Sequence, residues 1–285
     1  MNLTGVLVID KPAGITSHDV VMEAKRVIKA RKVGHIGTLD PFATGVLPLC
    51  IDRATRFARF LEEGPKEYIA TMKLGEETDT YDLDGRVMRT GDLTSITEAG
   101  IVSAIAGFKG RIVQIPPMFS AVKKDGIPLY KLARKGVVVD RIPREVKIYE
   151  AEPKELALPF VTFRVLCSKG TYIRSLCFDI GRKLGCGAHL VTLRRIRCGR
   201  FSIADSLPLD SPFLKERILP LEKVFKDIHG VEVDDHTARK IRNGLTPRGI
   251  EGLREGEMVR FVSGGRFIAL GQYRDNEGFE VVKVV

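Results

Sequence analysis

The chain has 285 residues, and 44% of them are hydrophobic, so it can bury a sizeable core and wholesale disorder is excluded. Lys and Arg outnumber Asp and Glu by 46 to 36, and the net charge of +10 allows a polyanionic partner without identifying one. The apolar run near the start is too short to cross a bilayer or to form a signal peptide, so we expect no membrane segment and no secretion.

The five cysteines form no Cys-x-x-Cys pair, and no histidines stand at zinc-finger spacing. This pattern predicts buried, reduced thiols in a cytoplasmic protein and no metal site. The chain also lacks a GxGxxG phosphate cradle and a Walker loop, so no nucleotide cofactor is predicted.

The first part of the chain combines strands and helices around a glycine-rich loop. Residues 6–9 predict a strand, 17–30 a helix with one apolar face, and 46–51 a buried strand. The glycine-rich loop, 34–45, lies between that helix and the second strand. A helix is predicted over 54–62, and apolar residues alternating from 68 to 74 predict a half-buried strand.

Farther along, strands are predicted near 111–115, 145–152, 160–167 and 189–198, and helices near 95–106, 127–135 and 171–184. This irregular order lacks the strict strand–helix alternation of a doubly wound sheet or a barrel. The sequence therefore predicts an α+β fold with a mixed, mainly antiparallel central sheet and flanking helices.

The pattern changes after Pro208. Prolines interrupt a connecting stretch, and from about residue 231 short strands alternate with glycine-rich turns, which is typical of a small β-rich module. We place the boundary near residue 228, giving one domain over 1–227 and a β-rich domain over 228–285. A basic stretch at about 123–144 is predicted as a helical insertion in the first domain.

Basic residues are concentrated between 161 and 200, where nine Lys and Arg stand against one acid, Asp179, a net charge of +8. Apolar residues interrupt the run at 194–197, as in a strand that presents cations from a packed scaffold. A solvated charge run is the alternative interpretation. The concentration favours a face that binds phosphates.

The loop 34–45 holds the residues best suited to chemistry. It places His35, Asp40 and two threonines next to glycines that let the backbone approach a ligand closely. On residue type alone, Asp40 could simply open a turn before Pro41, and His35 could hydrogen-bond the loop. These possibilities stay open at this point.

Five stretches occur in order along the chain: DKPAG with TS (10–14, 16–17), the loop 34–47, KEY (66–68), PPMFSAVK (116–123) and GTYIRSL (170–176). Together they resemble the TruB-type transfer-RNA pseudouridine synthases. The segment after 228 is similar to the small RNA-binding PUA domain usual in that family. Ile36 and Phe119 stand where many members have Thr and Tyr, which concerns only local packing and hydrogen bonding.

The resemblance implies an enzyme that isomerises uridine to pseudouridine in the T-loop of transfer RNA (tRNA), at the position called U55. The base would be flipped out of its stack and rejoined to the ribose through carbon. Because this rearrangement is internal and redox-neutral, it implies no cofactor and no metal. The expected partner is the T-stem-loop of tRNA, bound by a monomer.

By the same resemblance, Asp40 is the catalytic carboxylate, acting as a nucleophile or as a base. Arg174 is the cation that keeps this carboxylate ionised, since a guanidinium does not lose its charge. Tyr68 is expected to stack on the target base and to assist proton removal from carbon.

The resemblance also implies four substrate-binding residues. His35 is expected to fill the space that the flipped base leaves, and Leu193 to form an apolar wall of the base pocket. Lys11 and Pro12 belong to a motif that supports the active-site loop.

Two other functions remain to be weighed. One is that of a guide-RNA-dependent relative acting on ribosomal RNA, although the chain lacks the longer extensions expected of that branch. The other is a non-catalytic protein that binds or folds tRNA on the same scaffold. The presence of Asp40, Tyr68 and Arg174 argues against pure binding.

Overall fold

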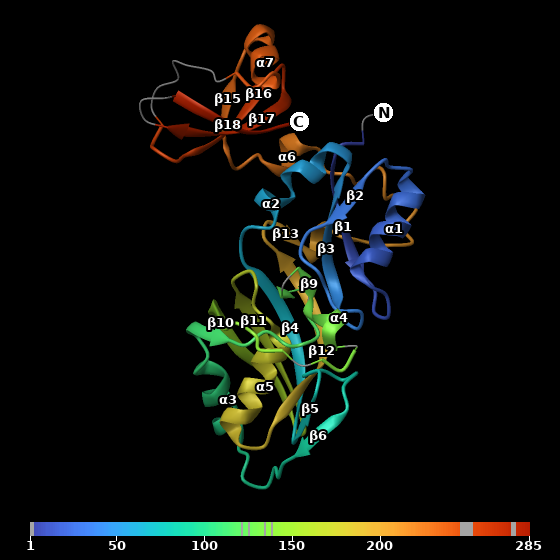
Figure 1. The fold of residues 1–285 in the computed structure, drawn as a ribbon, viewed down its shortest axis with the longest axis vertical. Helices are drawn as coiled ribbons and strands as arrows, with labels where there is room; N and C mark the ends of the chain where they lie inside the picture. The colour runs from blue at the N-terminus through green and yellow to red at the C-terminus, as the bar shows by residue number, and fades with distance from the viewer. Residues whose placement is uncertain are drawn as a thin grey trace.

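The computed structural model describes residues 3–120, 122–124, 126–133, 135–137, 139–245, 253–274 and 278–285. A 10-stranded mixed sheet forms its centre, and a 4-stranded sheet lies at one end of the long axis (Figure 1).

The main path of the large sheet is β14 (Leu207–Pro208), β1 (Gly5–Lys11), β3 (Thr44–Ile51), β12 (Ala188–Cys198), β4 (Lys66–Leu74), β11 (Phe160–Cys167), β10 (Arg144–Ala157) and β7 (Gly110–Gln114). Off this path, β2 (Val33–His35) pairs with β3, and β13 (Phe201–Ser202) pairs with β12.

Among the described strands of this sheet, parallel pairing occurs at two places, β1 with β14 and β3 with β12. Its other pairs are antiparallel. The predicted mixed, mainly antiparallel sheet is therefore confirmed. The parallel contact sets Arg194 and Arg195 of β12 opposite Thr44 and Gly45, so the middle of β12 lies beside the end of the glycine-rich loop.

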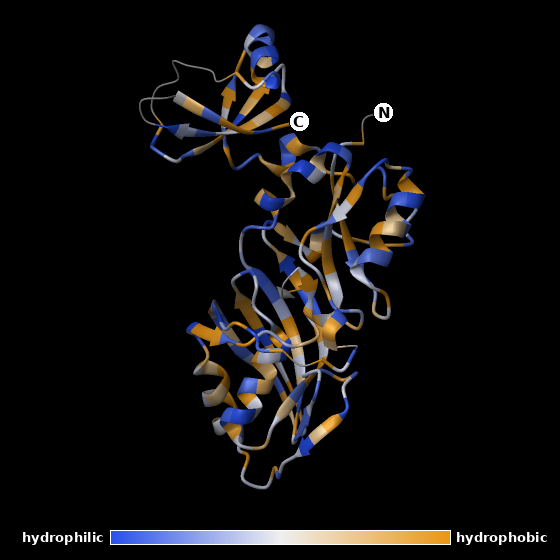
Figure 2. Ribbon diagram, in the orientation of Figure 1, coloured by the Kyte–Doolittle hydropathy of each residue, from blue (hydrophilic) through white to orange (hydrophobic). Residues whose placement is uncertain are grey.

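Three helices cover one face of the large sheet: α1 (Ser17–Ile28), α3 (Glu98–Ala106) and α5 (Ile173–Leu184). Thr16 starts α1 with a capping box, in which its hydroxyl accepts from the Asp19 amide and its amide donates to the Asp19 carboxylate. Every second residue of β4 is buried under these helices, and Figure 2 shows hydrophobic residues interleaved with hydrophilic ones along the central strands.

The opposite face of β1 and β3 packs against a second apolar cluster. It includes residues of η1 (Asp52–Phe57), α2 (Ala58–Leu61) and α6 (Leu221–Val224). The rings of Phe57, Phe225 and Phe267 meet there, with centroids 5.4–5.8 Å apart. Because Phe267 belongs to the small sheet, this cluster joins the two sheets.

The small sheet has the order β15 (His229–Glu232), β16 (Met258–Ser263), β17 (Arg266–Arg274) and β18 (Gly278–Val284), and α7 (Asp235–Arg242) packs on it. This is the β-rich segment that the sequence predicts after residue 228. The domain limits 1–227 and 228–285 themselves stay predictions, although β15 begins at His229.

Shorter elements complete the chain: β5 (Glu76–Thr78) with β6 (Val87–Thr90), β8 (Lys123–Lys124) with β9 (Ile127–Pro128), α4 (Leu129–Ala133) and η2 (Ile203–Asp205). The described parts of the predicted insertion 123–144 hold β8, β9 and α4, while residues 125, 134 and 138 lie outside the described residues. No helix in the described ranges is long and apolar enough to cross a membrane.

Candidate active site

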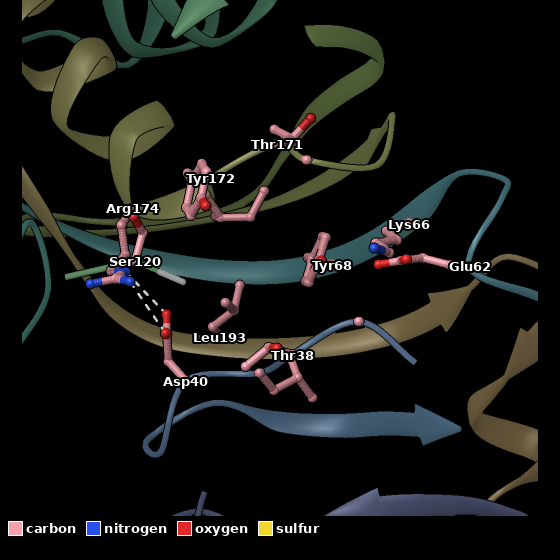
Figure 3. A pocket seen from close by; sticks show the side chains of 14 residues that line it. Thr38, Asp40, Glu62, Lys66, Tyr68, Ser120, Thr171, Tyr172, Arg174 and Leu193 are labelled. Atoms are coloured by element: carbon pink, nitrogen blue, oxygen red, sulfur yellow. Dashed lines mark hydrogen bonds and ion pairs between the residues drawn. The ribbon is translucent and has the colours of Figure 1, made fainter. Parts of the chain in front are cut away.

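A cavity of about 230 Å³ opens between the loop after β2, strands β4 and β12, and the turn that leads into α5 (Figure 3). Asp40, Tyr68 and Arg174 line it, and so does Leu193. These side chains come from four separate elements. The fold therefore brings together the three predicted catalytic residues and the predicted apolar wall of the base pocket.

The loop that carries Asp40 is held by Lys11 at the end of β1. The Lys11 side chain is fully buried, and Nζ donates to the carbonyl oxygens of Pro12, Pro41 and Ala43 at 2.9, 2.9 and 2.7 Å. An ammonium has three hydrogens, so no donor is left for a substrate. A direct contact between Lys11 and the substrate stays a prediction that these bonds do not favour. Lys11 supports the loop, and the exposed Pro12 contributes one of the carbonyls.

The environment of Lys11 also affects its protonation. Burial lowers the pKa of Lys11 to about 8, and the Arg195 charge acts in the same direction, whereas the Asp40 charge opposes the fall. The charge that holds the loop is thus sensitive to mildly alkaline pH.

A second buried cation, Arg195 of β12, holds the other side of the same loop. Its side chain is fully buried; Nε donates to the Val46 carbonyl at 2.7 Å and Nη2 to the Gly37 carbonyl at 2.9 Å. The strand passes so close that a Cβ at Gly45, where φ is +102°, would lie 2.1 Å from the Arg195 carbonyl oxygen. Only glycine fits at that position.

Arg174, in the first turn of α5, forms ion pairs with two carboxylates. Its Nε lies 3.0 Å from Oδ2 of Asp40 and its Nη2 3.2 Å from Oδ1, while its Nη1 lies 3.0 Å from Oδ2 of Asp82. Nη2 also donates to the Phe119 carbonyl at 2.6 Å. Because Phe119 binds through its backbone, its replacement of the more common Tyr leaves this contact intact. The two-point contact fixes both oxygens of Asp40.

Asp82 is itself fixed by its neighbours. Its Oδ1 accepts from the Thr80 hydroxyl at 2.5 Å and from the Asp84 amide at 3.2 Å. Between them, Tyr81 adopts a left-handed conformation with φ of 64°, and its ring stacks on Phe178 of α5 at 4.1 Å. The acidic loop is thus anchored to the same helix that carries the guanidinium.

The pKa of the Asp40 carboxyl is raised above its usual value. Enclosure by the protein is the main cause, although 32% of the side chain remains exposed, and the charges of Asp82 and Asp84 add to it. The charges of Arg174 and Lys11 act in the opposite direction. Arg174 is therefore the main group that favours the ionised carboxylate.

Tyr68 and Leu193 form the walls of the cavity. They lie on the paired strands β4 and β12, where Leu193 is opposite Ala70 and Arg195 is opposite Tyr68. Both side chains face the cavity between Asp40 and the end of β4 (Figure 3). Burial raises the pKa of Tyr68, against the opposing charge of Arg195, so the phenol keeps its proton at neutral pH.

His35 is not among the residues that line the cavity. It ends β2, opposite Leu49 of β3, and its buried Nδ1 finds no hydrogen-bond partner among the residues that the structure describes. Burial lowers the pKa of His35, and the Arg195 charge adds to the fall, so the ring is neutral at neutral pH. Its expected place in the space left by a flipped base stays a prediction.

The described residues contain no group of three or more His, Cys, Asp or Glu side chains that could hold a metal ion. All five cysteines are buried free thiols.

Family models match most of the chain. Residues 25–173 match the TruB family pseudouridylate synthase N-terminal domain, and residues 174–226 match the tRNA pseudouridylate synthase B C-terminal domain. The first match alone covers more than half of the 285 residues. The chain belongs to the TruB family.

Curated relatives and solved structures are similar to this TruB-family chain over nearly all of its length. The tRNA pseudouridine synthases B of Clostridium tetani and Clostridium acetobutylicum are each 44% identical to it, covering 99% of this chain and 100% of their own. A chain in the crystal structure of a Cbf5–Nop10–Gar1 complex matches with a TM-score of 0.75 and 31% identity, and one in an H/ACA RNP bound to a substrate RNA containing 2′-deoxyuridine with 0.74 and 28%. Each match covers 99% of this chain and 85% of the other.

In this TruB-family chain the basic residues of 161–200 are engaged within the molecule. Arg195 and Arg197 donate to backbone carbonyls, and Lys183 lies over the Phe108 ring. The other six pair with acids from elsewhere in the chain: Arg164, Lys169, Arg174, Arg182, Arg194 and Arg200. Because Lys169, Arg182 and Arg194 remain exposed, a phosphate-binding face over this segment stays a prediction.

Several residues of the TruB-family cavity and its support were not predicted from the sequence. Asp82 lies in the acid-rich segment 76–84, where its spacing matches no catalytic motif, and Arg195 was counted only as part of the basic segment. Ser120 lines the cavity, and its buried Oγ has no hydrogen-bond partner within the described part of the chain. The one signal that could have found Ser120 and Lys66 was their place in the stretches PPMFSAVK and KEY.

Proposed function

We propose that this chain isomerises uridine to pseudouridine in the T-loop of tRNA, at the position called U55. One observation carries the proposal: two nitrogens of Arg174 hold both oxygens of Asp40 inside a cavity that also contains Tyr68 and Leu193. The curated relatives that match over their whole length are named tRNA pseudouridine synthase B, which supports tRNA as the substrate.

The isomerisation replaces one glycosidic bond with another. The bond from uracil N1 to ribose C1′ breaks, the base turns, and C5 bonds to C1′. The proton on C5 is lost and N1 gains one, so atoms and electrons balance without an oxidant or reductant. The side chains of the chain have to provide an anion, an acid or base, and a surface on which the base can turn.

Asp40 is the proposed anion. It acts either as a nucleophile or as a base toward the sugar, and both roles need the ionised form. Enclosure disfavours that form, and the adjacent guanidinium of Arg174 offsets the cost. Because both carboxylate oxygens are held, the anion is oriented before the substrate arrives.

Tyr68 and Leu193 are the proposed contacts to the base. The ring of Tyr68 offers a face for stacking, which holds a base without fixing its rotation about the ring normal. Its protonated hydroxyl is placed to take part in proton transfer at the base. Leu193 closes the other side with an apolar surface that excludes water.

The uridine of a folded T-loop has to leave its stack to reach this cavity. We propose that the T-stem-loop binds over the cavity mouth, with His35 in the space that the base leaves. The domain 228–285 is proposed as a PUA-like RNA-binding domain. We also propose a monomeric, cytoplasmic protein, and the free, buried cysteines support the cytoplasm.

The alternatives are less well supported. The similarity to Cbf5 structures at 28–31% identity supports a shared fold, whereas the 44% identity to tRNA pseudouridine synthases B favours tRNA over ribosomal RNA. A protein that only binds or folds tRNA would not need a carboxylate held by two guanidinium contacts inside a cavity.

Pseudouridine mapping tests the proposal. Purified protein is incubated with an unmodified tRNA transcript and, separately, with ribosomal RNA fragments, without added cofactor or guide RNA. We expect pseudouridine at U55 of the tRNA and none in the ribosomal fragments. A modified ribosomal fragment, or an unmodified tRNA, would contradict the proposed substrate.

A further inference from the structure

Lys66, the first residue of β4, is a nearly buried lysine whose side chain faces the active-site cavity. The residue is 7% exposed. Among the described residues, no acceptor hydrogen-bonds its Nζ and no carboxylate lies within 4.0 Å of it. The carboxylate of Glu62 points toward it across the cavity rim but forms no ion pair (Figure 3). The Nζ of Lys66 keeps some surface open to the cavity, where an anion can bind it.

A second cation lies close to Lys66. A Cβ built on Gly37 would be 3.1 Å from Nζ of Lys66 and 3.3 Å from Nη1 of Arg195, so both cations approach the same side of that glycine. Arg195 is bonded to backbone carbonyls, whereas Lys66 is not. The positive charges of Lys66 and Arg195, partly shielded from water, repel each other. The arrangement is stabilised when an anion binds there.

The position of Lys66 relates it to the substrate. Lys66 and Tyr68 are two residues apart on β4 and point to the same face, with their Cα atoms about 7 Å apart at the usual strand rise. Lys66 lies at the end of the cavity away from Asp40 and Arg174 (Figure 3). A nucleotide whose base stacks on Tyr68 therefore brings its flanking backbone within reach of the lysine side chain.

We propose that Lys66 binds a backbone phosphate of the RNA next to the target uridine, and this inference rests on the proposed function. The anionic groups of RNA are its phosphates, and a lysine ammonium binds them as a point charge. A uracil carbonyl is neutral and would leave the repulsion between Lys66 and Arg195 in place. The contact gives the enzyme a fixed point from which the flipped base is positioned on Tyr68.

The first test is tRNA affinity, measured by filter binding at several salt concentrations for the full-length wild type, Lys66→Met and Lys66→Arg. Lys66→Met should weaken binding roughly ten- to a hundredfold, the usual value of a hydrogen bond to a charged group, and lower the salt slope by about 0.7–0.9. Lys66→Arg should retain most of the affinity. The matched control is Lys154→Met, which removes an exposed lysine paired with Glu152 and should bind like the wild type.

The second test locates the phosphate. T-stem-loop RNAs carry a single neutral methylphosphonate at each phosphate flanking the target uridine. At one position this change should weaken binding of the wild type about as much as Lys66→Met does, and cause no further loss in that variant. Urea unfolding checks that the variant is folded, and Lys66→Gln replaces it if it is not.

Three outcomes would overturn the proposal: wild-type affinity of the variant, equal losses from Lys66→Met and Lys154→Met, or additive losses at every methylphosphonate position. The last would mean that Lys66 contacts the base or supports the loop. Pseudouridine formation by the wild type in the same RNA is measured alongside. Its absence would count against the proposed function, whereas normal formation with unchanged binding would remove only the role of Lys66.

Discussion

Replacement of Arg174 by lysine keeps the charge and removes the geometry on which the candidate site depends. The guanidinium uses Nε and Nη2 for the two oxygens of Asp40 and Nη1 for Asp82. A lysine has one nitrogen at the end of a flexible stem and cannot reach all three oxygens. Arg174→Lys therefore leaves Asp40 less firmly held and less strongly favoured as the anion.

The size of the effect follows from these contacts. Loss of one or two hydrogen bonds between charged groups costs about 1.5–3 kcal/mol, which corresponds to a single-turnover rate lowered roughly ten- to a hundredfold at neutral pH. Enclosure already raises the pKa of Asp40, and weaker pairing with residue 174 raises it further. The rate should therefore begin to fall at a higher pH than in the wild type as the solution is acidified, and recover partly as pH rises.

Single-turnover rates with saturating enzyme, measured at several pH values and two salt concentrations, check this prediction. Affinity for tRNA should stay near that of the wild type, because the Arg174 side chain is 6% exposed and directed at carboxylates. A loss confined to affinity and sensitive to salt would show that Arg174 contacts phosphate instead. A wild-type rate with wild-type affinity would refute the role assigned to this residue.

Three further predictions follow from the structure. Asp82→Asn should lower the single-turnover rate about tenfold, since Arg174 loses a charged partner. It should also shift the acid limb of the pH–rate profile to lower pH, since the Asp82 charge raises the pKa of Asp40. An unshifted limb would count against this coupling. The wild-type rate should fall as pH rises through about 8, where Lys11 loses the proton with which it holds the loop, and a flat profile above that pH would mean that its charge is dispensable. Phe267→Ala should lower the free energy of unfolding by about 3–5 kcal/mol in urea titrations, and a change under about 1 kcal/mol would contradict the packing that joins the two sheets.

Much of the fold could be predicted because burial alternates with strand or helix period. The apolar residues from 68 to 74 identified β4, yet the strand begins two residues earlier, at Lys66. Because lysine is usually exposed, the burial of Lys66 could not be predicted. Strand β10 was predicted to end at 152 and continues to Ala157, because Pro153 lies beside a shift in register where a ladder hydrogen bond is not required. The predicted helix over 54–62 is instead the 3₁₀ segment η1 followed by the short α2.

The site was predictable in part for a different reason. The resemblance identified Asp40, Tyr68 and Arg174, which the fold brings to one cavity. It could not show that Asp82 shares the guanidinium, because that contact joins residues 92 positions apart. Nor could it show that the Lys11 ammonium donates all its hydrogen bonds within the molecule, since the full burial of this side chain depends on how β1 packs under the loop.

The internal contacts of residues 161–200 could not be predicted for the same reason. A count of charges within a window records the cations and not their partners, and those partners lie on other elements. Arg164 of β11 pairs with Glu67 of β4, and Arg194 of β12 pairs with Asp10 of β1. The ammonium of Lys66, which stands outside the segment, is left without a partner among the described residues.

The proposed isomerisation depends most on Asp40 being an ionised, reactive carboxylate. Tritium release from tRNA labelled at C5 of uridine, in single turnover with saturating enzyme, tests this directly for the wild type and Asp40→Asn. The amide preserves the volume of the side chain and removes its charge. We predict release by the wild type, and no detectable release by the variant although it folds and binds tRNA with near wild-type affinity. Appreciable release by Asp40→Asn would contradict the account.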